Sequence, residues 1–297
     1  NCFNKLIFAP NKIRGFFMIN FKGTIQSNTT QLTTNNRGFL YGDAVFETIK
    51  IANSKVLLLE EHYFRLMSSM RILRMQIPAN FTMEFFEQQI ILTAVASNCS
   101  ESARVRITMF RNDGGLYLPQ SREVSYVIAA SALASAKYIL DENPYEVELY
   151  KDFFVTAQLL STLKTTNKII NTVASIYAEE NDFQNCLLIN EKKNVVEAIN
   201  GNLFMVKDNM LITPSLDEGC VNGMIRKQLL KLAKKDNYGL TVVEGTISPF
   251  DLQKADQLFI TNVITGIQPI TKYRKKEYEN TILAKLLQDL NQSLNLV

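Results

Sequence analysis

Three segments in the second half of the chain contain residue types that could do chemistry. The segment LKTTN at 163–167 places Lys164 between a strand-like stretch and an amphipathic helical stretch. The segment VVEAINGNLF at 195–204 places Glu197 after two β-branched residues and before a turn. The segment GCVNGMIRKQLL at 219–230 runs from a glycine-containing loop straight into a helical pattern. Each has an ordinary explanation when taken alone: a solvated lysine, a turn, and a structural helix start.

The lysine, the carboxylate and the helix start gain a joint meaning because one cofactor requires all three. Pyridoxal phosphate chemistry uses a lysine amine that bonds to the cofactor aldehyde and a carboxylate that keeps the pyridine nitrogen protonated. The phosphate needs N–H donors, which a helix N-terminus leaves free, together with a basic residue. The three segments therefore indicate pyridoxal phosphate as the cofactor.

The composition argues against several other kinds of protein. The 297-residue chain has one histidine, His62, so a histidine-rich metal site is excluded, and no metal is expected. No P-loop motif and no GxGxxG motif occurs. The four cysteines lie far apart without a CxxC pair, which is typical of a reducing compartment. The net charge of +3 is too balanced to indicate a nucleic-acid partner.

The sequence predicts neither a signal peptide nor a membrane span. The stretch 1–17 mixes apolar and basic residues and lacks an uninterrupted apolar core. The longest nearly apolar run, at 126–136, is far shorter than the roughly 20 residues that cross a bilayer. We therefore expect a cytoplasmic protein with no membrane partner.

Hydrophobic periodicity predicts an α+β fold with a mostly antiparallel sheet in the first half. Alternating residues predict strands, and apolar residues three and four apart predict helices. The predicted strands are 45–51, 55–59, 104–110, 124–129, 153–157, 186–190, 203–206 and 257–261. The predicted helices are 60–75, 83–97, 167–180, 223–235 and 281–294, with a short helix starting at Ser248-Pro249.

A break in both periodicities predicts two domains. The stretch 139–149 contains Asp, Glu, Asn and Pro, and we expect it to link the domains. Residues 18–138 then form a small α/β domain, and residues 150–297 form a larger cofactor-binding domain. Residues 1–17 precede the first patterned residue, Met18, and are expected to be an extension outside the fold.

Six motifs in order along the chain resemble those of the class IV aminotransferases, the fold-type IV pyridoxal phosphate enzymes. They are RGFLYGDAVFETIK at 37–50, LLLEEHYFRL at 57–66, LKTTN at 163–167, VVEAINGNLF at 195–204, GCVNGMIRKQLL at 219–230 and ADQLFITNVITGIQPI at 255–270. The resemblance implies a small α/β N-terminal domain and a larger β-barrel-like C-terminal domain with helices. It also implies a homodimer with residues of both subunits near each site.

The resemblance also implies a role for each matching residue. Lys164 would bond to the cofactor and then shuttle the proton at the α-carbon of the substrate, and Glu197 would pair with the pyridine nitrogen. The expected phosphate contacts are Arg65, the backbone of Met224 and Ile225, and the turn at Asn262 and Val263. Tyr41 and Glu47 are expected on the substrate side, and His62 is expected to be a scaffold residue.

The chain departs from the family pattern at several of these positions. Ile225 and Val263 stand where threonine is common, so the phosphate would lose hydroxyl donors there. Ala198, Ile199 and Asn200 replace the usual serines or glycines after the glutamate. The lysine, the carboxylate and the arginine are all retained.

The motifs leave the reaction open. Our leading hypothesis is an aminotransferase acting on an amino acid of the branched-chain kind and a 2-oxo acid. The alternative is a 4-amino-4-deoxychorismate lyase, which releases pyruvate and 4-aminobenzoate. The segments VNGMIR and TNVITGIQPI look more like the lyases, whereas RNDGGLYLP at 111–119 is no clean match to them. A silent homologue used for binding is a third alternative, which the intact lysine, glutamate and arginine disfavour.

Overall fold

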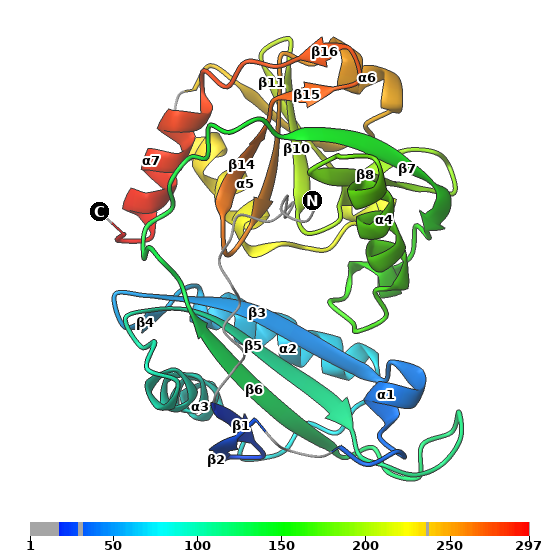
Figure 1. Ribbon diagram of the computed structural model, residues 1–297, viewed down its shortest axis with the longest axis vertical. Coiled ribbons are helices and arrows are strands. Elements are labelled where there is room, and N and C mark those ends of the chain that lie inside the picture. The colour runs from blue at the N-terminus through cyan, green and yellow to red at the C-terminus, as the bar shows by residue number, and fades with distance from the viewer. Residues whose placement is uncertain (1–17, 29–31, 236–237, 297) are drawn as a thin grey trace, which may run out of the picture.

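The computed structural model describes residues 18–28, 32–235 and 238–296. The predicted extension, 1–17, lies outside these residues. Figure 1 shows one six-stranded sheet with its helices in the lower half and two five-stranded sheets with their helices above it. The fold is mixed α+β, as the periodicity predicts. In the described part of the chain, no helix is long and apolar enough to cross a membrane.

The six-stranded sheet is antiparallel throughout and has the order β2-β1-β6-β5-β3-β4. Its strands are β1 (Met18–Phe21), β2 (Thr24–Ser27), β3 (Ala44–Ala52), β4 (Lys55–Val56), β5 (Ser102–Arg111) and β6 (Val124–Ala132). Helices α2 (Leu59–Ile72) and α3 (Met83–Ala96) cover one face, and α1 (Arg37–Tyr41) precedes β3.

Alternation along β5 decides which residues each face of this sheet presents. Ala103, Val105 and Ile107 are buried against α2 and α3, where Phe86 and Ile90 complete the core. The residues between them on β5 point away from the helices, toward the upper half of the molecule. One face is therefore core, and the other is free to line a site.

The upper half holds two sheets, in the orders β12-β11-β10-β13-β14 and β16-β15-β7-β8-β9. Their strands are β7 (Glu146–Val155), β8 (Asn185–Asn190), β9 (Val195–Ala198), β10 (Asn202–Lys207), β11 (Met210–Pro214), β12 (Thr241–Gly245), β13 (Gln257–Asn262), β14 (Gly266–Ile270), β15 (Lys272–Tyr273) and β16 (Lys276–Glu277). A tight turn between β9 and β10, with Ala198 bridged to Gly201, carries the chain from one sheet to the other. The two sheets curl around a shared core, as a barrel-like domain requires.

Helices close the outside of this half. They are α4 (Ile169–Glu180), α5 (Met224–Lys235), α6 (Pro249–Lys254) and α7 (Leu283–Ser293), with 3-10 turns at Leu159–Thr162 and Leu216–Glu218. The predicted start of α6 is confirmed: Ser248 and Asp251 cap each other, and Pro249 is the first helical residue. Apolar residues of α5 and α7 pack together against β10 and β13.

The connection between the two halves begins and ends earlier in the chain than the predicted linker, 139–149. Strand β7 begins at Glu146 because Val147 and Leu149 alternate with polar residues and are buried. Residues 133–145 contain no helix or strand. The division into two domains with a boundary here stays a prediction.

Candidate active site

A cavity of about 510 Å³ lies between the free face of β3 and β5 and the upper half of the molecule. It contains seven of the nine residues that the motifs nominate: Arg65, Lys164, Glu197, Met224, Ile225, Asn262 and Val263. These seven come from five separate elements and loops. The two others, Tyr41 and Glu47, do not line it.

Lys164 is held in this cavity by the backbone around it. The chain after the 3-10 turn runs antiparallel to the start of β3: Phe46 N–H donates to the Lys164 carbonyl at 2.8 Å, and Thr166 N–H donates to the Ala44 carbonyl at 3.1 Å. The Lys164 Nζ lies 4.5 Å from the centroid of the Phe46 ring. The lysine is therefore fixed to the lower sheet although it belongs to the upper half.

This environment lowers the pKa of Lys164 from 10.5 to about 7. Burial is the main cause, the positive charge of Arg65 adds to it, and Glu47 partly opposes both. A much larger share of the molecules than for an ordinary lysine then carries Lys164 as the neutral amine at neutral pH. A neutral lysine amine is a nucleophile, which an ordinary lysine is not at this pH.

Glu197 lies on β9 behind the lysine. Val195 and Val196 are fully buried, and the strand carries the glutamate into the interior with them. Its Oε2 accepts a hydrogen bond from Val221 N–H at 2.9 Å. Burial raises the pKa of Glu197, while Lys168 and the Val221 N–H act in the opposite direction. A buried carboxylate with room beside it is suited to pair with a protonated ring nitrogen.

The loop before α5 presents backbone N–H groups to the cavity. A side chain at Gly223 would displace the Asn202 side chain, because a Cβ there would lie 2.0 Å from the Asn202 Oδ1. The side chains of Met224 and Ile225 are buried, so both face the cavity mainly with their backbone. Within the described residues, neither of their N–H groups has a hydrogen-bond acceptor. A helix start of this kind is suited to bind a phosphate.

A second turn, at residues 262–265, faces the same space. The Asn262 Oδ1 accepts hydrogen bonds from the N–H groups of Ile264 and Thr265, both at 3.0 Å. The side chain of Asn262 thus shapes its own turn. The Val263 N–H has no acceptor in the part of the chain that the structure describes. This turn therefore offers a backbone donor to an anion.

Arg65 brings a fixed positive charge to the cavity, and Glu47 holds it. The Arg65 Nε and Nη2 donate to the two Glu47 oxygens at 2.7 and 2.5 Å, and Nη1 donates to the Asn222 carbonyl at 2.7 Å. Burial would raise the pKa of Glu47, but Arg65 and His62 outweigh it and hold the pKa at about 2. One hydrogen on each Nη nitrogen remains for a ligand.

Glu47, which we expected on the substrate side, does not line the cavity, and its role toward the substrate stays a prediction. The side chain is 1% exposed and lies between Arg65 and His62. Burial lowers the pKa of His62, with Glu47 opposing, so the neutral ring donates Nδ1–H to the Glu47 Oε2 at 2.8 Å. His62 thus supports the glutamate, and the glutamate orients the arginine.

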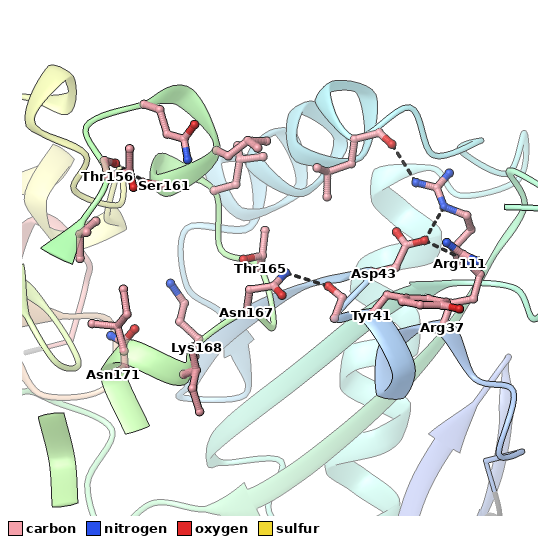
Figure 2. Close-up of a pocket in the computed structure, with 18 of the residues that line it drawn as sticks. Arg37, Tyr41, Asp43, Arg111, Thr156, Ser161, Thr165, Asn167, Lys168 and Asn171 are labelled. Atoms are coloured by element: carbon pink, nitrogen blue, oxygen red, sulfur yellow. Dashed lines mark hydrogen bonds and ion pairs between the residues drawn. The ribbon is translucent and has the colours of Figure 1, made fainter. Parts of the chain in front are cut away.

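Tyr41 lines a second cavity, of about 620 Å³, which adjoins the first. The two cavities share Lys168, Asn171 and Glu197. Figure 2 shows Arg37 and Arg111 converging on Asp43 beside Tyr41, and each donates to the Asp43 Oδ2 at 2.9 Å.

Two arginines in the first cavity were missed at the sequence level. Arg104 and Arg106 alternate along β5 and both point into the cavity, where the Arg106 guanidinium lies 3.6 Å from the Phe46 ring centroid. Burial and, to a smaller extent, the positive charge of Arg104 lower the pKa of Arg106 to about 10. The alternation in RVRITMF was visible, but nothing in the sequence said what its polar face meets.

Comparison with known proteins gives the family. A protein of Methanocaldococcus jannaschii, provisionally named a branched-chain-amino-acid aminotransferase, is 26% identical over 90% of this chain and 91% of its own. The aminodeoxychorismate lyase of Vibrio harveyi is 26% identical over 90% of this chain and 96% of its own. The fold matches that of the branched-chain aminotransferase of Thermoproteus uzoniensis with norvaline, with a TM-score of 0.83. The match covers 94% of this chain and 95% of that protein, at 21% sequence identity.

The profile of the family described as amino-transferase class IV matches residues 44–273, which is most of the chain and includes Lys164, Glu197 and Arg65. Enzymes of this family depend on pyridoxal phosphate. The lysine of lowered pKa, the buried carboxylate and the free N–H groups fit that cofactor. The chain belongs to the class IV aminotransferases and is a pyridoxal phosphate-dependent enzyme.

Proposed function

We propose that this enzyme transfers an amino group between an amino acid and a 2-oxo acid. The observation that supports it most is the shared cavity of Lys164 and Glu197, where the lysine has a pKa of about 7. Bound pyridoxal phosphate would supply an aldehyde that takes up the amino group and a ring that withdraws electrons. The chain would supply attachment, orientation and proton transfer.

The predicted residues that line the cavity would then act together. The Lys164 Nζ would hold the cofactor through its aldehyde carbon and, once released by substrate, would move the proton at the substrate α-carbon. Glu197 would keep the ring nitrogen protonated. The N–H groups of Met224, Ile225 and Val263 would bind the phosphate, together with the charge of Arg65.

The lining of the cavity supports an amino acid with an apolar side chain as substrate. Arg104 and Arg106 offer cationic donors for a carboxylate. Phe46, Ile199 and Ile264 supply apolar surface beside them. A branched-chain amino acid combines these two needs, as the name of the Methanocaldococcus jannaschii relative also suggests.

A second candidate is aminodeoxychorismate lyase. The pair Arg104 and Arg106 favours it, because aminodeoxychorismate has two carboxylates and the cavity has two arginines from one strand. The Vibrio harveyi relative has this activity in its name. The lyase would use Lys164 and Glu197 in the same way, and the reaction would release pyruvate and leave 4-aminobenzoate.

Two assays on the same purified protein separate the candidates. In one, a panel of amino acids is supplied with 2-oxoglutarate, and the keto acid product is measured. In the other, aminodeoxychorismate is supplied alone, and pyruvate is measured. Keto acid production from a branched-chain amino acid supports the transferase, and pyruvate release without an added 2-oxo acid supports the lyase.

We also propose that the enzyme is a homodimer. Three large apolar side chains that line the second cavity are exposed: Tyr117, Phe154 and Leu160. Phe39, Leu116 and Leu118, which are close in sequence to other residues of its lining, are exposed as well. Side chains of this kind in one region are typical of a surface that another chain covers. Sedimentation velocity tests this proposal, and a monomer at micromolar concentration would contradict it.

A further inference from the structure

Tyr138 lies in the segment that joins the two halves, and its position is fixed from several sides. The side chain of Asn291 on α7 pairs with both backbone groups of Tyr138, each at 2.9 Å. The Tyr138 ring packs against Gly266, where a Cβ would lie only 2.6 Å from the ring. The residue is 3% exposed. Helix α7 and the start of β14 therefore fix this ring.

The hydroxyl of Tyr138 reaches the turn at residues 262–265. It donates to the Val263 carbonyl at 2.8 Å. Burial raises the pKa of Tyr138, so the hydroxyl keeps its proton and stays a donor. On the other side of the same peptide, the Ile264 N–H donates to the Asn262 Oδ1. Both ends of the peptide between Val263 and Ile264 are thus held, and its plane is fixed.

The ring of Tyr138 also meets the lower sheet. The Lys50 Nζ, on β3, lies 4.1 Å from the ring centroid, close enough for a cation–π contact. Lys50 is 2% exposed, and among the described residues no carboxylate lies within ion-pair distance of it. A small cavity of about 210 Å³ lined by Lys50, Tyr138, Ile264 and Thr265 lies behind the turn. Tyr138 thus connects β3, α7 and the turn.

We propose that Tyr138 is a positioning residue that holds the turn 262–265 in the orientation that presents the Val263 N–H to the cofactor phosphate. The proposal rests on the proposed function, because it takes this turn as part of the phosphate site. It assigns to the connecting segment a task beyond joining the two halves. Tyr138 itself touches neither cofactor nor substrate.

The test is Tyr138→Phe, which removes one oxygen and keeps the ring. Tyr278→Phe is the matched control, because the Tyr278 hydroxyl also donates to a backbone carbonyl, that of Leu252, at 2.6 Å and lies outside the cavity. Two measurements are made on the apo proteins: hydrogen exchange of a peptide covering 262–268, and pyridoxal phosphate affinity by titration. The phosphorus NMR shift of the bound cofactor is recorded as well.

We expect Tyr138→Phe to speed exchange of this peptide, to weaken cofactor affinity about three- to tenfold, and to move the phosphorus shift. Tyr278→Phe should leave all three unchanged. Unchanged exchange in Tyr138→Phe would overturn the proposal, and so would faster exchange with unchanged affinity. Equal losses in both variants would also overturn it, since they would indicate general loosening. A wild-type protein that binds no pyridoxal phosphate would instead overturn the proposed function, and with it the phosphate role of the turn.

Discussion

The carboxylate of Glu47 holds the guanidinium of Arg65 through two parallel hydrogen bonds, 2.7 Å from Nε to Oε1 and 2.5 Å from Nη2 to Oε2. The glutamate comes from β3 and the arginine from α2, so the pair joins the sheet to its covering helix. Because the carboxylate is buried, it offsets the arginine charge without reaching the cavity itself. Arg65 therefore enters the site in one fixed orientation.

Glu47→Gln should make the fold less stable and remove part of its dependence on pH. The pKa of Glu47 is about 2 in the folded protein against an ordinary 4.5. The pair therefore stabilises the fold above pH 4.5, and this contribution disappears as the pH falls from 4.5 toward 2. Its size is about 3 kcal/mol for a shift of this extent.

Urea unfolding at a series of pH values measures this effect. The difference in free energy of unfolding between wild type and Glu47→Gln should be largest at neutral pH and shrink below pH 4.5. Glu60→Gln, an exposed glutamate on the same helix as Arg65, is the control and should show a small difference. A pH-independent difference for Glu47→Gln would contradict the assigned pairing.

Glu197→Gln should slow proton transfer by orders of magnitude while cofactor binding weakens less. The amide keeps the shape of the side chain and removes the charge that holds a ring nitrogen protonated. Single-turnover kinetics on the cofactor-loaded variant and a separate cofactor titration measure the two effects. Near-normal turnover in this variant would show that the carboxylate has another task.

Arg106→Gln should raise KM about ten- to a hundredfold and change kcat less, because a buried charge-assisted contact to a carboxylate is lost. Arg71→Gln removes the same charge from the exposed end of α2 and should leave both constants unchanged. Steady-state kinetics on the best substrate measures KM and kcat of both variants and of the wild type. If both variants behave like wild type, the substrate carboxylate binds elsewhere.

Gly223→Ala should weaken pyridoxal phosphate binding by about 1–3 kcal/mol, since the added Cβ collides with Asn202 and shifts the loop before α5. Gly245→Ala is a suitable control, because a Cβ there meets its nearest neighbour at an ordinary 3.5 Å. Fluorescence titration of each apo-protein compares them. Equal affinity in the two variants would place the phosphate away from this loop.

The sequence motifs nominated Lys164, Glu197 and the two backbone turns, and the structure places all of them in one cavity. Glu197 lies on β9 and Met224 begins α5, whereas Lys164 follows a 3-10 turn and is fixed by the pairing of its neighbours with β3. The helices at 59–72 and 83–96 were equally readable, because their apolar residues recur three and four apart.

Contacts between residues far apart in the chain could not be predicted from local sequence patterns. Glu47 and Arg65 meet only because β3 lies under α2. Alternation places Glu47 on the same face of β3 as Val45 and Ile49, but no local pattern shows that α2 brings an arginine there. Arg104 and Arg106 show strand alternation, but the cavity they enter is formed by the other half of the chain. Strand β14 was missed because Gly266 and Pro269 are poor strand residues whose pairing with β13 overrides propensity.

The most direct test of the account is the site of covalent attachment. Borohydride reduction of the protein loaded with pyridoxal phosphate, followed by peptide mapping, should label Lys164 alone, because its pKa of about 7 leaves a reactive amine facing the cavity. Lys168 is an internal control, since it lines the same cavity and lies four residues further along the chain. A label on Lys164 that Lys164→Ala abolishes is the predicted result. A label on Lys168, or no label at all, would contradict the central assignment.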